Sequence, residues 1–272
     1  MATQSTHKQL AGFSQASQIH VKDGHIKGQP RRVEHRRFNE SFLVHASTSP
    51  FYPLFASLDV GAHMMKGRSG EVLWDDTIRL GIEMRKKLRA ISREYGQDPD
   101  PLRRWFFEPF VPAMTTHDGR EIPWEDVPTD DLAVGARYWM MQPGETWHGF
   151  QHVAPDYAMT DPNKLTLLMP GFDRATGQAE PHGIPAPLLA QYLRENRIVA
   201  EKNDLHSILF LITPGVESSK AGTLLSWLVT FKRLHDENAR LQDVIPDFVR
   251  RRPARYNGWL ARPLRRDASV LR

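Results

Sequence analysis

The chain has 272 residues, of which 40% are apolar and 25% charged, a balance typical of a globular protein with a sizeable core. Its length allows one large domain or two ordinary ones. It has no cysteine, which excludes disulfides and thiolate metal sites, and no apolar run long enough for a membrane-spanning helix. Its first residues lack the pattern of a signal peptide, so we expect a cytoplasmic protein without a metal centre.

The net charge of +4 is a property of the C-terminal end. Residues 248–272 contain eight arginines and one acid, Asp267, a net +7 that leaves −3 for the rest of the chain. No basic module with interleaved aromatic residues lies before this tail. A nucleic-acid partner is therefore not expected.

Two helices and a strand are predicted near the N-terminus. Residues 17–22 alternate apolar and polar side chains, which is the period of a strand. Residues 37–44 are predicted to form a helix. Three of its apolar side chains are expected to face inward: Phe38, Phe42 and Leu43. A second helix is predicted over 51–65, after hydroxyl residues and a proline that suit a helix start.

The middle of the chain contains the clearest helix, over 69–95, where apolar residues recur at steps of three and four with basic residues opposite. Residues 105–111 predict an irregular strand. The polar segment 115–131 predicts a loop. A strand is predicted over 137–141. In the turn that follows, His148 has no paired base or ligand in the sequence, so we interpret it as a packed loop residue.

The C-terminal half alternates strands and helices. Strands are predicted over 164–169, 198–201 and 207–213, the last being a near-continuous apolar run typical of a buried strand. Helices are predicted over three ranges: 184–194, 220–234 and 241–249. This order predicts α/β layers. No P-loop, dinucleotide-binding motif, zinc spacing, nucleophile elbow or internal repeat occurs.

The most suggestive chemistry lies in the tetrapeptide Ser5-Thr6-His7-Lys8. A lysine amine can form a Schiff base with an aldehyde cofactor, and hydroxyl and imidazole groups beside it can hold a phosphate. A second hydroxyl-rich segment, 45–50, precedes a helix whose free N–H groups suit an anion. From the residues alone, the alternatives are a solvated lysine and a simple helix cap.

Several segments together carry a family resemblance: ATQSTHKQLAGFSQASQIH (2–20), HASTSPFYPLFASLDV (45–60), DPNKLTLLMPG (161–171), GIPA (183–186) and SILFL (207–211). They resemble the bacterial ornithine/lysine/arginine decarboxylases, which depend on pyridoxal 5'-phosphate (PLP) and have the aspartate aminotransferase fold type. The resemblance runs from Ala2 to about Gly258. It implies an α/β fold with an incomplete PLP-binding large domain over 1–66, followed by an α+β small domain over 67–245.

The resemblance also implies roles for individual residues around the cofactor. Lys8 matches the lysine that binds PLP, and Ser5 and His7 match the neighbours that hold its phosphate. Thr48 and Ser49 match a loop that reaches the cofactor of a neighbouring subunit. The intact enzyme is therefore expected to be a homodimer or a higher homo-oligomer.

Glu201 matches the acidic residue that faces the distal amine of the substrate. The expected reaction is decarboxylation of a basic amino acid to a polyamine-type amine and CO2. The pair Glu201-Lys202 and the segments 45–56 and 204–211 are most similar to the ornithine enzymes. We therefore rank ornithine first, lysine second and arginine third.

Both ends of the chain differ from the family. Family members have a long portion before the cofactor lysine, so we expect this chain alone neither to hold PLP productively nor to decarboxylate. Residues 246–272 are expected to begin a further domain, and a frameshift from about residue 259 would explain the departure there. An alternative is a non-catalytic binding or regulatory protein that associates with a full-length decarboxylase.

Overall fold

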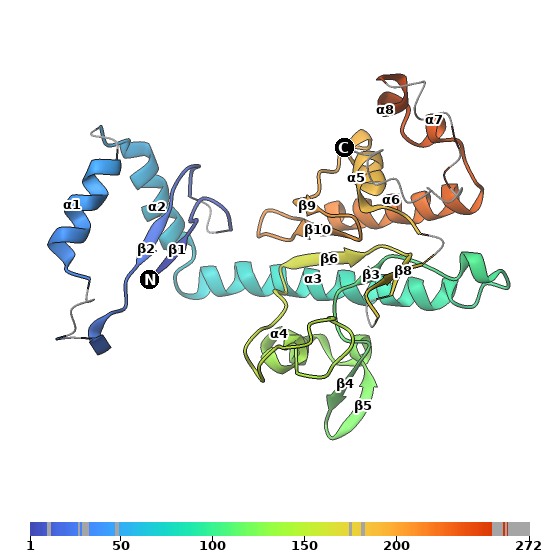
Figure 1. Ribbon diagram of the computed structural model, residues 1–272, viewed down its shortest axis with the longest axis horizontal. Coiled ribbons are helices and arrows are strands. Elements are labelled where there is room, and N and C mark those ends of the chain that lie inside the picture. The colour runs from blue at the N-terminus through green and yellow to red at the C-terminus, as the bar shows by residue number, and fades with distance from the viewer. Residues whose placement is uncertain are drawn as a thin grey trace. The chain divides into compact units, whose positions relative to one another are not determined.

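The computed structural model describes residues 1–9, 12–26, 28, 33–46, 49–173, 176–180, 183–251, 258 and 260. The chain divides into two compact units, Met1–Trp74 and Asp75–Arg272, and each is described by itself (Figure 1). Most of the arginine-rich tail lies outside the described residues. Within the described part, no helix has the length and apolar character needed to cross a membrane.

The first unit contains a two-stranded sheet and two helices. Strand β1 (Ala2–Gln4) pairs antiparallel with β2 (Gln18–His20), and a short 3-10 helix, η1 (Gly24–Ile26), follows. Helix α1 spans His35–His45 and α2 spans Tyr52–Met64. The predicted strand and both predicted helices are confirmed.

The inward orientation predicted for α1 is wrong. None of its described residues is buried, and Phe42 and Leu43 are 49% and 63% exposed. Phe38 is only half-buried. The helix forms as its apolar spacing predicts, but the described part of this unit supplies no apolar surface that covers these side chains.

The second unit is built on a four-stranded antiparallel sheet with the order β3-β6-β10-β9. These strands are Glu108–Pro109, Lys164–Leu168, Ser207–Leu211 and Lys202–Asn203, respectively. Leu167 lies opposite Ile208 and Leu165 opposite Phe210, and all four side chains are buried. Alternation along both central strands thus gives the sheet one apolar face.

Helices complete this core. Long helix α3 (Gly67–Tyr95) contributes Met84 and Leu88, and the hydrophobic cluster also includes side chains of α5 (Ala186–Glu195) and α6 (Ser218–Asp236). Two short helices, α7 (Leu241–Val244) and α8 (Pro246–Arg251), replace the single helix predicted over 241–249. Pro246 divides them, because proline has no N–H with which to continue a helix.

The strand predictions at the two sheet edges were inaccurate. Of the predicted strand 105–111, Glu108 and Pro109 pair as β3, and the Phe110 N–H donates to the Thr166 carbonyl oxygen of β6 at 2.9 Å. Proline is tolerated there because β3 is an edge strand. The strand predicted over 198–201 is misplaced, because β9 begins only at Lys202, directly after the predicted range. Two small elements do not belong to this sheet: η2 (Pro101–Arg103) and a hairpin of β7 (Phe172–Asp173) with β8 (Gln178–Ala179).

The segment predicted as a loop, 115–131, is instead folded. It contains the hairpin of β4 (Met114–His117) and β5 (Arg120–Pro123), the 3-10 turn η3 (Trp124–Asp126) and the first half of α4 (Thr129–Val134). The two residues between the strands, Asp118 and Gly119, have φ values of 47° and 73°. Asp-Gly is a strong signal for such a two-residue hairpin turn.

The strand predicted over 137–141 is a 3-10 helix, η4 (Ala136–Trp139). Tyr138 and Trp139 are adjacent and both buried, which a strand with alternating faces would not allow. They belong to a second hydrophobic cluster with Trp124, Leu132 and Ile82 of α3. In Figure 1, the sheet and the β4–β5 hairpin lie on opposite sides of α3.

Arg85 on α3 is buried and fixes the segment before β6. Its guanidinium donates to the carbonyl oxygens of Pro162 at 2.7 Å, Lys164 at 2.8 Å and Gly81 at 3.0 Å. It also lies 5.0 Å from the centre of the Trp139 ring. Burial lowers the pKa of Arg85 to about 9, so the group remains charged at neutral pH.

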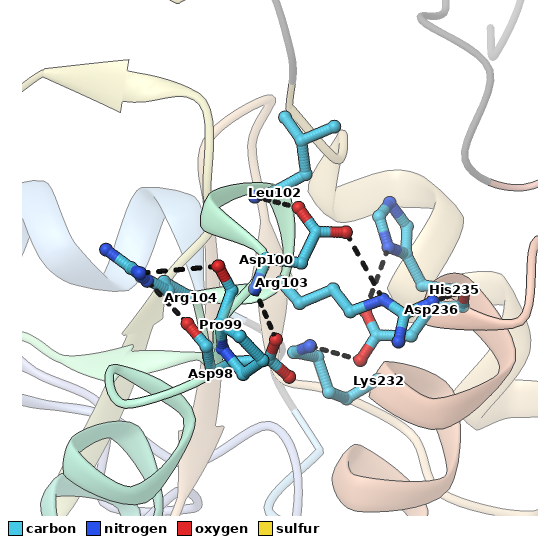
Figure 2. A network of polar contacts seen from close by, with 9 residues as sticks. All are labelled: Asp98, Pro99, Asp100, Leu102, Arg103, Arg104, Lys232, His235 and Asp236. Atoms are coloured by element: carbon cyan, nitrogen blue, oxygen red, sulfur yellow. Dashed lines mark hydrogen bonds and ion pairs between the residues drawn. The ribbon is translucent and has the colours of Figure 1, made fainter.

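A second buried cation lies near the end of α6. Lys232 forms an ion pair with Asp236 one turn later (Figure 2), and its Nζ lies 4.4 Å from the centre of the Tyr95 ring and 4.7 Å from that of Trp105. His235 contacts the same Trp105 ring edge-on, with 4.9 Å between centroids. These contacts attach the segment after α3 to α6.

Replacing Arg85 with alanine should destabilise the second unit by about 3 kcal/mol, because buried carbonyl oxygens lose their donors and a cavity opens. Urea unfolding monitored by tryptophan fluorescence measures the loss. Lys87→Ala, at an exposed position of the same helix, should change the unfolding free energy by less than about 0.5 kcal/mol. Equal effects of the two substitutions would contradict the role assigned to Arg85.

His235 should make the fold sensitive to mild acid. Burial lowers its pKa, an effect that the nearby Asp236 only partly offsets; the other facing charges are Lys232, on its own helix, and Arg103, which donates to the Asp236 carbonyl. As pH falls through about 6.5, the unfolded chain binds a proton that the folded chain does not, so stability decreases.

The unfolding free energy, measured between pH 7.5 and 5.5, should therefore fall less steeply in His235→Gln than in the parent chain. The exposed His152 provides the control, since His152→Gln should keep the parent slope. An unchanged slope in His235→Gln would show that other groups determine the acid response.

Candidate functional site

The candidate cofactor lysine lies in a tight turn directly after β1. The Lys8 backbone N–H donates to the Ser5 carbonyl at 3.4 Å, which brings both ends of Ser5-Thr6-His7-Lys8 together. Ser5 and Lys8 are exposed, and His7 is half-buried. Within the described part of the chain, no hydrogen bond or ion pair engages the Lys8 ammonium group.

The turn contains a buried hydroxyl without a partner. Thr6 is 4% exposed, and its Oγ1 has no hydrogen bond to any described residue. His7 Nδ1 lies 2.7 Å from the Ala16 carbonyl oxygen. Because a carbonyl can only accept, Nδ1 carries a proton and Nε2 is left for another partner.

Two residues that the sequence did not single out hold this turn against α2. The Thr6 carbonyl accepts from the Gly12 N–H at 3.0 Å, and a Cβ on Gly12 would lie 3.0 Å from a Leu58 methyl carbon. The Ser57 hydroxyl accepts from the Phe13 N–H at 2.9 Å and donates to the Leu54 carbonyl. In the sequence, the sign of this role was Ser57 itself, a serine within a largely apolar helix.

The hydroxyl loop is only partly described. Thr48 lies outside the described residues, whereas Ser49 is exposed just before α2. Helix α2 begins with Pro53 in its first turn, and its N-cap residue Phe51 supplies no side-chain cap. The hydroxyl capping expected for this helix is therefore absent at the N-cap position.

Glu201 belongs to the second unit, at the edge of the sheet formed by β9. Its backbone N–H donates to the Leu209 carbonyl of β10 at 2.9 Å, so sheet pairing fixes the backbone at this position. The side chain is exposed. A carboxylate placed this way can pair with a cationic group that approaches this edge.

His148 is a packed loop residue, as predicted. Its Nε2 lies 2.9 Å from the Gln142 carbonyl oxygen, and its Nδ1 accepts from the Phe150 N–H at 3.0 Å. These two partners specify one tautomer, with the proton on Nε2. No group of three or more potential metal ligands occurs within the described ranges.

The sequence matches the family model described as "Orn/Lys/Arg decarboxylase, major domain" over residues 1–220. The chain belongs to the Orn/Lys/Arg decarboxylase family. The family and the α/β fold class predicted from the sequence are thereby confirmed.

Named relatives fall into three substrate groups. Constitutive ornithine decarboxylase of Escherichia coli (strain K12) is 46% identical over 262 residues, which cover 96% of this chain and 35% of the relative. Lysine decarboxylase LdcA of Pseudomonas aeruginosa is 39% identical, covering 94% of this chain and 31% of the relative. Biodegradative arginine decarboxylase of E. coli is 37% identical, with corresponding coverages of 94% and 33%.

Solved structures agree with this assignment. Lysine decarboxylase A from P. aeruginosa matches with a TM-score of 0.76 and 36% identity, covering 95% of this chain and 32% of that one. The E. coli constitutive lysine decarboxylase matches with a TM-score of 0.74 and 35% identity, at coverages of 95% and 32%. This chain therefore spans about a third of the length of the relatives it matches.

Substituting Gly12 should loosen the lysine turn. In Gly12→Ala the new methyl group meets the Thr6 carbonyl and Leu58, so the loop must shift and its protection from proteolysis should fall several-fold. The control is Gly24→Ala, where nothing lies within 4 Å of the added carbon. Mass spectrometry of limited digests locates the cleavage, and equal cleavage of the two variants would contradict this packing.

Proposed function

We propose that this chain is the part of a PLP-dependent decarboxylase that carries the cofactor lysine and a substrate-binding carboxylate. The substrate would be a basic amino acid, ornithine first, and the products CO2 and a polyamine-type amine. The observation that carries the proposal is the exposed Lys8 in a turn of hydroxyl and imidazole groups, in a chain whose relatives are named for decarboxylating ornithine, lysine or arginine.

The residues of the turn fit a phosphate-bearing aldehyde. Lys8 supplies an accessible amine, while Ser5 and the orphaned hydroxyl of Thr6 can donate to phosphate oxygens. His7 keeps Nε2 available because Ala16 binds the other ring nitrogen. When bound, PLP supplies an electron sink for the electron pair left as CO2 departs. Lys8 would hold the cofactor, and Ser5 and His7 would position its phosphate.

Glu201 would recognise the distal amine of the substrate. A carboxylate pairs well with an ammonium group, and the hydrogen bond to Leu209 gives this carboxylate a backbone held by the sheet. The ornithine enzyme described above shares more identity with the chain than the lysine and arginine enzymes do. This order supports ornithine first, lysine second and arginine third.

Assembly with further polypeptide is part of the proposal. Neither hydrophobic cluster includes a described residue of Met1–Trp74, although this unit exposes many large apolar side chains. Those on or beside its two helices are Phe42, Leu43, Val44, Phe51, Tyr52, Phe55, Val60 and Met64. Such a surface is typical of an interface. In the intact homo-oligomer, Thr48 and Ser49 would reach the cofactor of a neighbouring subunit.

The same exposed surface favours a second candidate function. A chain that spans about a third of its relatives and retains this interface would bind a full-length decarboxylase without itself catalysing the reaction. We therefore expect little CO2 release from ornithine by the isolated chain. Stable co-purification with a full-length family member, without PLP attachment at Lys8, would favour this candidate.

Lys8 should be the lysine that reacts selectively with PLP. After incubation of the chain with PLP and reduction with borohydride, peptide mass spectrometry should find the added mass on the Lys8 peptide. Lys8→Ala should remove that label, whereas Lys22→Ala, at another exposed lysine near β2, should leave it unchanged. Labelling spread evenly over exposed lysines would count against a cofactor site in this turn.

A further inference from the structure

The His7 ring is connected to α2 by three hydrogen bonds in series. The Ser57 hydroxyl of α2 accepts from the Phe13 N–H at 2.9 Å. The Phe13 carbonyl accepts from the Ala16 N–H at 3.2 Å. The Ala16 carbonyl oxygen in turn lies 2.7 Å from Nδ1 of His7. A helix side chain 44 residues beyond Phe13 therefore supports the ring beside Lys8.

The direction of every bond in this series is fixed. Ser57 gives its own proton to the Leu54 carbonyl at 2.7 Å, so its oxygen is left to accept from Phe13. Backbone N–H groups can only donate, and carbonyl oxygens can only accept. At the end of the series the Ala16 carbonyl needs a donor, and His7 supplies it as Nδ1–H.

A backbone hydrogen bond, more than side-chain packing, holds this loop at Phe13. The Phe13 side chain is 59% exposed, whereas Ser57 and Ala16 are buried. The next residue of α2, Leu58, approaches Gly12 so closely that an added Cβ would lie 3.0 Å from its methyl carbon. The Ser57 hydroxyl thus anchors the loop where it meets α2.

The tautomer of His7 decides which ring nitrogen can contact a phosphate. With Nδ1–H bonded to the Ala16 carbonyl, a proton added to the ring goes to Nε2. The ring can then donate a charge-assisted hydrogen bond from Nε2 to a phosphate oxygen while Nδ1–H keeps its carbonyl acceptor. If that carbonyl moved away, the neutral ring could carry its proton on either nitrogen. Support of the Ala16 carbonyl is therefore support of the phosphate contact.

We propose that Ser57 is a positioning residue for His7: it holds the loop that keeps the ring in its Nδ1–H form and Nε2 available to the cofactor phosphate. The phosphate step rests on the function proposed above. The step from Ser57 to the ring does not, because its hydrogen bonds are all made between groups of this chain.

Nuclear magnetic resonance of the full chain, with its histidine ring nitrogens labelled, tests the step from Ser57 to the ring. The spectra are recorded above neutral pH, where imidazole is uncharged, and His7→Gln identifies the His7 signals. The parent ring should be mainly the Nδ1–H tautomer. In Ser57→Ala it should become a mixture of the two tautomers. The Phe13 amide should also exchange its hydrogen several-fold faster, because it has lost its acceptor.

The matched control is Ser41→Ala on α1. The Ser41 hydroxyl donates to the Arg37 carbonyl at 2.9 Å within its own helix, so its removal should leave the His7 tautomer unchanged. Alanine favours a helix at either position, and circular dichroism checks that each variant is folded. A parent ring protonated mainly on Nε2, an unchanged tautomer in Ser57→Ala, or the same change in Ser41→Ala would each overturn the proposal.

The phosphate step is measured as the PLP concentration that gives half-maximal borohydride-trapped label on Lys8. Ser57→Ala should need about threefold more PLP, as expected for one weakened hydrogen bond, and Ser41→Ala should need the parent concentration. A changed tautomer with an unchanged PLP concentration would overturn the link to the phosphate. Lack of selective Lys8 labelling in the parent chain would count against the proposed function instead, and the tautomer would still decide the role of Ser57.

Discussion

The Arg85 guanidinium connects the two hydrophobic clusters of the second unit. It extends from the stretch of α3 where Ile82 enters one cluster and Met84 the other. By donating to carbonyl oxygens on either side of Asn163, it fixes how the chain enters β6, the strand that pairs with both β3 and β10. Because Trp139 packs against the same group, one buried cation determines how the sheet and the β4–β5 region both contact α3.

A half-buried carboxylate has a related role near the C-terminal end of the described chain. Glu195, the last residue of α5, accepts from the N–H groups of Asp247 at 3.0 Å and Phe248 at 2.9 Å. These donors lie in the first turn of α8, where backbone N–H groups have no partner within the helix. A side chain from α5 thus caps α8. Together with Lys232, it shows that charged groups, as well as apolar ones, fix the helices around this sheet.

The sequence predicted the parts of the fold that repeat a simple period. Helix α3 and strands β6 and β10 have regular apolar spacing, and each formed within two residues of its expected bounds. The β4–β5 region was missed because its two strands have only four residues each, too short for a period, although Asp118-Gly119 marked the turn. The local pattern also could not reveal that Arg85, on the basic face of α3, would be buried. The carbonyl oxygens that accept from its guanidinium include those of Pro162 and Lys164, which are far away in the sequence.

For the candidate site, the family resemblance proposed the residues, and the structure adds their local geometry. The tetrapeptide at Lys8 would look like any polar turn without its family context. The sequence did not show how this turn is held in place. Gly12 allows a close approach to Leu58, and the Ser57 hydroxyl accepts a hydrogen bond from the Phe13 N–H, 44 residues earlier. Such contacts depend on how α2 lies against the turn, and no spacing rule encodes that.

The hydrogen bonds of His148 have a consequence for the loop around it. Both ring nitrogens are occupied, one as donor and one as acceptor, so the ring has no lone pair left for a metal ion. The imidazole therefore links Gln142 and Phe150 by one hydrogen bond to each. Its tautomer, visible as a pair of nitrogen chemical shifts, would report whether this stretch of chain is closed or has been pulled open.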